Sequence, residues 1–242
     1  MSKTLFLAGA SGAIGKRLVP LLVADGWRVA GTTRVAGKAD LLRGLGAEPV
    51  IVDAFDAEAL AAAVAEVRPA VVVHQLTDLP PGLDPTKMAE ARVRNARLRD
   101  EGTRNLIAAS VRAGARRLVA QSLAFAYAEG PLPHAEDDPL DPEQRGVISL
   151  ESQVLNAPFE GVVLRYGRLY GPGTGFERAQ GPAPLHVDAA ARAAFLAAIH
   201  GEPGAYNFAE DDGQVSSEKA KRSLGWSADW RNRTDVASAP QP

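Results

Sequence analysis

Thr4-Leu-Phe-Leu-Ala-Gly-Ala-Ser-Gly-Ala-Ile-Gly-Lys-Arg-Leu18 is the stretch that decides the fold, because an apolar strand runs directly into three evenly spaced glycines. Gly9 permits a tight turn, Gly12 lets the backbone approach a pyrophosphate, and Gly15 lets a helix pack closely on the strand. Amides at the start of that helix face the bound anion. The order of strand, glycine turn and helix therefore predicts a dinucleotide-binding site, against the alternative of a glycine-rich turn without a ligand. The residues expected to contact the cofactor here are Gly9, Ser11, Gly12, Ala13, Ile14 and Gly15.

A second strand, from Arg28 to Thr33, ends at Arg34. An NAD enzyme usually carries an acidic residue at this place, where it binds the ribose 2′-hydroxyl. Arg34, together with Lys38, suits a 2′-phosphate instead, so the sequence favours NADP as the cofactor and leaves NAD as the second possibility. The alternative for Arg34 is a solvated cation at the end of a strand.

Two further strand ends are expected to complete the cofactor site. Asp53-Ala54 follows a strand over 48–52, and a carboxylate there can accept a hydrogen bond from the adenine amino group; the alternative is that Asp53 caps the helix expected over 57–67. The strand over 70–75 is almost continuously apolar, which is typical of a strand covered on both faces. His74 within it is interpreted as a packed histidine at a strand end. The other residues expected beside the cofactor are Gln75, Leu76, Thr77 and Tyr166.

The composition limits the possible functions. With 242 residues the chain can form one α/β domain with appendages, or one domain and a small lobe. A net charge of −2 supplies no excess of cations for sequence-independent binding to nucleic acid. The absence of cysteine excludes disulfides, thiolate catalysis and cysteine-based metal sites. No apolar run reaches the ~18 residues of a membrane span, and no signal peptide precedes the first strand, so we expect a cytoplasmic protein without a membrane partner.

The middle of the chain alternates helical and strand-like segments. No metal site is expected, since His186 and Asp188 are only two ligands; this pair is interpreted as a helix start with Asp188 as the cap. The segments predicted between them and the cofactor strands are a helical stretch over about 85–114, a strand over 117–121 that ends at Ser122, an ordered loop over 128–142, a helix over 144–155 and a strand over 161–165.

Five motifs occur in an order that indicates a known family. They are Gly9-Ala-Ser-Gly-Ala-Ile-Gly15, Val72-Val-His-Gln75, Glu101-Gly-Thr-Arg-Asn-Leu106, Leu164-Arg-Tyr-Gly-Arg-Leu-Tyr-Gly-Pro-Gly173 and Leu185-His-Val-Asp188. Over about residues 3–210 the chain resembles the extended short-chain dehydrogenase/reductases, the NAD-dependent epimerase/dehydratase family. The resemblance implies an α/β fold with a Rossmann-like, doubly wound parallel sheet of about seven strands and a small, shortened C-terminal substrate lobe. The implied boundaries are 1–170 for the NAD(P)-binding domain, 171–230 for the lobe and 231–242 for a flexible tail.

The family's catalytic pattern is only partly present. Its members use a Tyr-x-x-x-Lys pair for proton transfer and a serine on the fifth strand to polarise the substrate oxygen, and Ser122 matches that serine. The pair falls on Glu143 and Val147, and no tyrosine or lysine occurs between 128 and 165. Arg99 likewise stands where the family usually has asparagine. Tyr127 is the nearby phenol and the alternative proton donor, although family members commonly carry a tyrosine there in a structural role.

Two functions remain open at this stage. The first is an NADP-dependent oxidoreductase or epimerase of an atypical short-chain dehydrogenase type, acting on a small carbonyl or sugar-like substrate with Ser122 in the polarising role. The retained serine and the loop over 128–142 favour it. The second is an NADP-binding redox sensor or scaffold without dehydrogenase activity, which the missing acid–base pair favours, because hydride transfer to a carbonyl needs a proton donor. In either case we expect a monomer or a homodimer.

Overall fold

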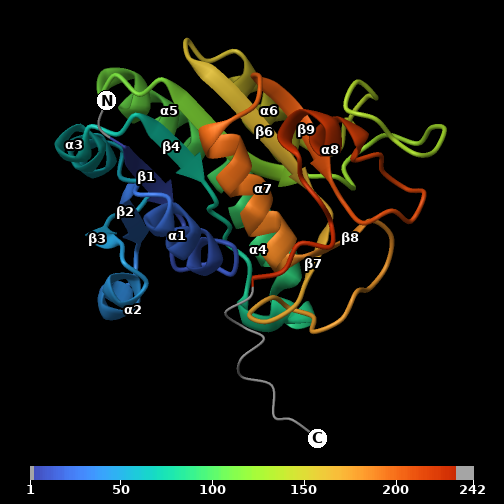
Figure 1. Cartoon of the computed structure of the whole chain (residues 1–242), viewed down its shortest axis with the longest axis horizontal. Coiled ribbons are helices and arrows are strands. Elements are labelled where there is room, and N and C mark those ends of the chain that lie inside the picture. Colours follow the sequence, from blue (N-terminus) through green and yellow to red (C-terminus); the bar gives the residue numbers. More distant parts are fainter. Residues whose placement is uncertain (1–2, 233–242) are drawn as a thin grey trace, which may run out of the picture.

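The computed structural model describes residues 3–232. Its centre is a seven-stranded sheet in the order β3-β2-β1-β4-β5-β6-β9, with every neighbouring pair parallel (Figure 1). The chain winds outward from β1 in both directions, so the strand order reverses between β1 and β4. The predicted α/β, doubly wound Rossmann-like fold is therefore confirmed. The strands are β1 (Thr4–Ala8), β2 (Arg28–Thr33), β3 (Glu48–Ile51), β4 (Val71–His74), β5 (Arg117–Leu123), β6 (Glu160–Tyr166) and β9 (Gly204–Phe208).

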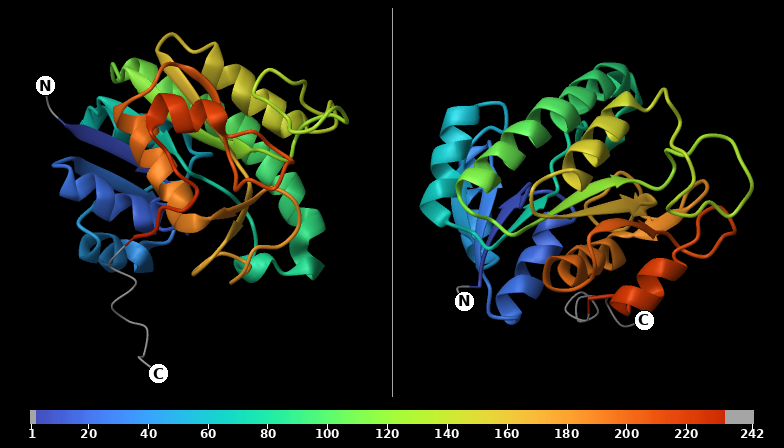
Figure 2. Two further views of the ribbon diagram at one scale, coloured as in Figure 1. Left: turned by 45° about the vertical axis from the view of Figure 1, so that its right-hand side comes forward. Right: turned by 90° about the horizontal axis from the view of Figure 1, so that it is seen from above.

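Helices cover both faces of this sheet (Figure 2). On one face α1 (Gly15–Ala24) packs against α7 (Val187–Ile199), and the alanines of α7 are buried in this contact layer. On the other face α5 (Thr103–Arg112) lies between α3 (Ala57–Val67) and α6 (Arg145–Leu155). With both faces covered, the carboxyl ends of the strands are the part of the sheet that a ligand can reach.

The C-terminal third contributes to the main sheet as well as to a separate small one. The lobe predicted over 171–230 supplies β9 to the sheet and α7 to its cover, while β7 (Arg168–Tyr170) pairs with β8 (Pro184–His186) apart from it. The tail predicted over 231–242 lies outside the described residues from position 233 onward. Between residues 3 and 232, no helix combines the length and apolar character needed to cross a membrane. The remaining helical segments are α2 (Ala39–Gly44), α4 (Met88–Arg97), α8 (Glu218–Leu224) and the short η1 (Ala36–Lys38), η2 (Pro81–Leu83) and η3 (Pro85–Lys87).

The helix predicted over about 85–114 contains an irregular turn. After α4, a π-helical turn, η4 (Leu98–Gly102), leads into α5. A Cβ atom on Gly102 would come within 2.8 Å of Leu98 Cδ1, so a larger residue there would have to displace this leucine side chain. Helical periodicity does not reveal the π-helical turn. The fifth strand also differs from its prediction: it continues through Ser122, which pairs with Arg165 on β6.

His74 joins the sheet to the helix layer as a fully buried neutral ring. Its Nδ1 accepts a hydrogen bond from the Leu76 amide (3.2 Å), so the proton lies on Nε2, which is 3.0 Å from Thr103 Oγ1. Burial lowers the pKa of His74 to about 4. The interpretation of His74 as a packed histidine agrees with this environment.

This burial makes the free energy of unfolding depend on pH. In the unfolded chain the histidine has a pKa near 6.5 and is protonated below that pH. In the folded chain His74 becomes protonated only when the pH falls to about 4. Stability from this group is therefore complete above about pH 6.5 and declines as pH falls through 4, by roughly 3–4 kcal/mol in total. We expect urea unfolding to show a smaller loss between pH 7 and pH 4.5 in His74→Asn than in the wild type. Equal losses in the two proteins would contradict the assignment.

Candidate functional site

A cavity of about 290 Å³ opens at the carboxyl ends of β1, β2, β3 and β4. This is the side of the sheet, and the point of strand reversal, at which open α/β sheets bind their ligands. Segments from all four strand ends therefore meet here although they are far apart in the sequence. The predicted cofactor residues that line the cavity are Gly9, Ser11, Gly12, Arg34, Lys38, Asp53, Ala54, Gln75, Leu76 and Thr77.

Two close approaches of the backbone shape the glycine turn. Gly9 has φ of +92°, and a Cβ atom there would lie 2.6 Å from the carbonyl oxygen of Gln75. A Cβ atom on Gly15 would lie 2.5 Å from the carbonyl oxygen of Ala10. Both positions consequently require glycine, Gly9 for its conformation and its contact with β4, and Gly15 for the packing of α1 against the turn.

The start of α1 presents backbone donors next to this turn. Its N-cap residue, Ile14, makes no side-chain capping bond, and the amides of Ala13 and Ile14 donate to no acceptor within residues 3–232. Gly12 is exposed on the rim of the cavity. The side chain of Ile14 is buried, so any contact of this residue with a cofactor would come from its backbone. Free amides at a helix start fit a pyrophosphate.

A buried acceptor deeper in the cavity also fits a ligand. Gln75 Oε1 is buried and has no hydrogen-bond partner, while its Nε2 lies 3.4 Å from the Tyr166 hydroxyl. Buried polar atoms are rarely left unpaired in native proteins, so a ligand donor is expected to complete this group. Tyr166 itself is fully buried behind Gln75, and burial raises the pKa of its phenol above the usual range. Tyr166 and the backbone-contacting residues Ala13, Ile14 and Gly15 are the predicted cofactor residues that do not line the cavity.

Several charged side chains lie where β2 and β3 end at the cavity. Asp53 Oδ1 accepts a hydrogen bond from the Phe55 amide (3.0 Å), whereas α3 is capped by Asp56, which accepts from the Ala59 amide (3.0 Å). The alternative that Asp53 caps this helix is therefore wrong. Arg34 donates to Asp78 at 2.8 Å, so it is not simply a solvated cation.

Sequence reasoning missed three polar residues of this cavity. Thr32 Oγ1 accepts a hydrogen bond from the Gly9 amide (3.2 Å), and Thr33 Oγ1 lies 3.4 Å from Ser11 Oγ. Asp78 lines the cavity beside Thr77. The sequence could have indicated these residues, because they lie at the ends of β2 and β4 and every residue at such an end is a candidate for ligand contact.

The two predicted catalytic residues lie in a buried polar network instead of at the cavity wall. Ser122 Oγ donates to Glu151 Oε1 at 2.5 Å, and the same carboxylate forms an ion pair with Arg165 (2.7 Å). Arg165 also donates to the Tyr127 hydroxyl (2.8 Å), which donates to Asn207 Oδ1 (2.7 Å). The structure thus joins Ser122 and Tyr127 through Glu151 and Arg165, and the catalytic role of either hydroxyl stays a prediction.

The two positions at which the family resemblance places the Tyr-x-x-x-Lys pair lie on α6 and just before it. Val147 is buried on α6, and Glu143 is an exposed carboxylate just before this helix. Burial raises the pKa of the Tyr127 phenol, which makes deprotonation harder. Arg99 in the π-helical turn is partly buried, and its side chain forms no hydrogen bond or ion pair with any residue from 3 to 232.

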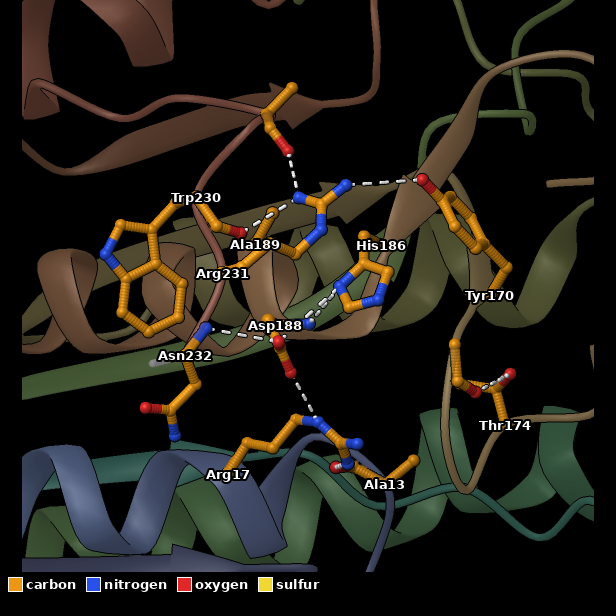
Figure 3. A network of polar contacts seen from close by, with 12 residues as sticks. Ala13, Arg17, Tyr170, Thr174, His186, Asp188, Ala189, Trp230, Arg231 and Asn232 are labelled. Atoms are coloured by element: carbon orange, nitrogen blue, oxygen red, sulfur yellow. Dashed lines mark hydrogen bonds and ion pairs between the residues drawn. The ribbon is translucent and has the colours of Figure 1, made fainter. Parts of the chain in front are cut away.

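His186 and Asp188 form a structural contact (Figure 3). His186 Nδ1 accepts from the Asp188 amide (3.2 Å) and is the cap of α7, so the expectation that Asp188 caps this helix is wrong. The Asp188 carboxylate instead accepts from Arg17 Nε on α1 (2.6 Å) and from the Asn232 amide (3.2 Å). Asp188 thereby ties the two helices on this face of the sheet to the last described residues.

Comparison with known protein families identifies a nucleotide-binding family, which agrees with the geometry of the cavity. A family model described as NAD(P)H-binding matches residues 9–201. The chain belongs to this NAD(P)H-binding family. A curated relative, the 3-diazoavenalumate denitrifying reductase of a Streptomyces species, is 42% identical over 237 residues, covering 86% of this chain and 76% of the relative.

Solved structures similar to this NAD(P)H-binding protein share its fold. One is a UDP-glucose 4-epimerase from Thermotoga maritima with UDP-glucose, at a TM-score of 0.76 and 19% identity over 92% of this chain and 93% of that one. Another is the enzyme WbmG of Bordetella bronchiseptica in complex with NAD, at 0.74 and 18% over 97% and 91%. The predicted resemblance to short-chain dehydrogenase-like epimerases is confirmed.

Gly12→Val tests whether the glycine turn and the start of α1 bind the cofactor. The Cβ atom at this position would lie 3.3 Å from the Gly9 carbonyl oxygen, a tight contact that the turn must relax by a few tenths of an ångström, and the branched side chain would enter the space in front of the α1 amides. We expect calorimetry to show no NADPH or NADH binding. Gly44→Val, on the exposed surface of α2 with no atom within 4 Å of its added Cβ, is the matched control and should bind normally. Circular dichroism should report folded proteins, and nucleotide binding by folded Gly12→Val would contradict the site.

Proposed function

We propose that this protein is an NADPH-dependent reductase that removes a diazo group from a small organic acid as N₂. The relative that is 42% identical across most of the chain supports the reaction type, since its name states a diazo substrate, loss of nitrogen and reduction. The single observation that carries the proposal is that, among residues 3–232, the hydroxyls of Ser122 and Tyr127, which were expected to act on a carbonyl, are both engaged in a network with Glu151, Arg165 and Asn207.

The chemistry of the substrate explains why such a site can work. A reduced nicotinamide supplies a hydride when bound. A carbonyl that accepts hydride becomes an alkoxide, which needs stabilisation and a proton from the protein. A diazonium carbon that accepts hydride forms a C–H bond as its C–N bond breaks, and N₂ leaves with the bonding electrons. For a diazonium ion, atoms and charge balance with no added proton, because hydride brings the hydrogen and its electron pair and neutral N₂ leaves. A neutral diazo substrate first takes one proton from solvent to become the diazonium ion, so Ser122 and Tyr127 can remain in their buried network.

A second candidate function rests on the same observation. An NADP-binding redox sensor or scaffold would also keep the glycine turn and the free α1 amides, and it would need no proton donor. The two candidates differ in turnover, because only the reductase consumes NADPH when a substrate is present. For both, Arg34 and Lys38 in the cavity support binding of a 2′-phosphate.

Turnover on a substrate panel separates these functions. With diazo acids we expect NADPH oxidation, followed by absorbance, together with an equal amount of N₂, followed by mass spectrometry; ketones, aldehydes and nucleotide sugars should give neither. Ser122→Ala should retain turnover within about threefold, because no oxyanion forms, whereas loss of a needed oxyanion donor typically costs about 10²–10³. A loss of that size would give Ser122 the polarising role expected from the sequence. No turnover on the whole panel would favour the sensor.

Arg34→Ala tests the preference for NADPH. Removal of the guanidinium should weaken NADPH binding by about 1.5–3 kcal/mol, the range for hydrogen bonds to charged groups, and leave NADH binding unchanged. Titration calorimetry with both nucleotides measures the difference. Arg43→Ala, an exposed arginine on neighbouring α2 outside the cavity lining, is the control for a general loss of charge. Equal losses for the two nucleotides in Arg34→Ala would contradict the 2′-phosphate assignment.

A further inference from the structure

Asp78 lies between two arginines at the adenosine end of the cavity. Its Oδ1 accepts from Arg34 Nη2 at 2.8 Å, and its Oδ2 lies 3.4 Å from Arg94 Nε. Arg34 comes from the end of β2, Asp78 from the segment after β4, and Arg94 from α4. Both Arg34 and Asp78 line the cavity, so the ion pair between them is part of the wall that a nucleotide would meet.

The two partners of the Arg34–Asp78 ion pair are held very differently. The Asp78 amide donates to Oδ1 of the buried Asn95 (2.9 Å), and the Asp78 side chain is only 15% exposed. Arg34 is 53% exposed, and Asp78 is its only hydrogen-bond or ion-pair partner within residues 3–232. Arg34 is therefore the side that can move, while Asp78 stays fixed to α4.

We propose that Asp78 competes with the 2′-phosphate of NADP(H) for Arg34 and so limits how strongly this site prefers NADP(H) to NAD(H). The inference rests on the proposed NADP(H) cofactor. When Arg34 turns to a phosphate, Asp78 keeps its ion pair with Arg94 and its place beside Asn95. After this exchange the partly buried Asp78 carboxylate still has a cation beside it. The cost of an unpaired buried charge therefore does not arise. Arg94 acts through Asp78 and makes the release of Arg34 possible.

Asp78→Asn measures the competition. The amide keeps the shape and the hydrogen-bonding oxygen but removes the charge that holds Arg34. The probes are 2′,5′-ADP and 5′-AMP, which differ in the 2′-phosphate, and calorimetry on the full chain gives both affinities without turnover. We expect 2′,5′-ADP to bind about threefold to tenfold more tightly than to the wild type, and 5′-AMP within about twofold. The control Asp40→Asn, which removes an equal charge from an exposed ion pair on α2, should change neither affinity beyond about twofold.

Arg94→Gln gives the opposite result if the competition is real. Without Arg94, Asp78 holds Arg34 more strongly, so 2′,5′-ADP should bind about twofold to fivefold more weakly, and the same change in an Asp78→Asn background should have no effect. An unchanged or weaker affinity of Asp78→Asn for 2′,5′-ADP, with normal 5′-AMP binding, would overturn the competition and leave the cofactor site intact. Failure of the wild type and the variants to bind either nucleotide would overturn the proposed function and this inference together.

Discussion

The cofactor cleft depends on the contact between the first glycine turn and the fourth strand. At Gly9 the backbone adopts φ of +92° and lies so close to the Gln75 carbonyl that a side chain of any size would push β1 and β4 apart. This contact fixes the end of β1 against the end of β4, where the strand order reverses. Gly15 applies the same constraint between the turn and α1. Gly9, Gly12 and Gln75 consequently line one cavity, next to the free amides at the start of α1.

The far end of the sheet is organised by a buried ion pair. Glu151 on α6 and Arg165 on β6 are almost inaccessible to solvent, and each satisfies the other's charge at 2.7 Å. Removal of either partner would leave an uncompensated buried charge, so both must retain their hydrogen-bonding neighbours. Ser122 and Tyr127 are such neighbours. Their hydroxyls are therefore engaged in the hydrogen-bond network of this ion pair.

The charged side chains around Arg34 are held less rigidly than the buried ion pair. Arg34 is half exposed and has a single carboxylate partner, whereas Asp78 is anchored to α4 through Asn95 and Arg94. An exposed arginine in one ion pair can change partners at small cost, because solvent screens the pair and replaces its hydrogen bonds. A binding site with a fixed anion and a movable cation can adjust to ligands that differ by one phosphate.

The sequence by itself determined the β1–turn–α1 unit and the succession of strands, because each of these is a property of residues close together in the chain. It also placed Arg34 and Asp53 at the correct edge of the sheet, since parallel strands end on one side. Only the tertiary structure decided which groups pair: Asp78 with Arg34 across 44 residues, Ser122 with Glu151, and Arg17 with Asp188. It likewise showed Asp56 and His186 as the helix caps and Leu98 packed into the π-helical turn. The physical reason is that side-chain partners depend on strand order and on the packing between layers, which local periodicity and propensity do not encode.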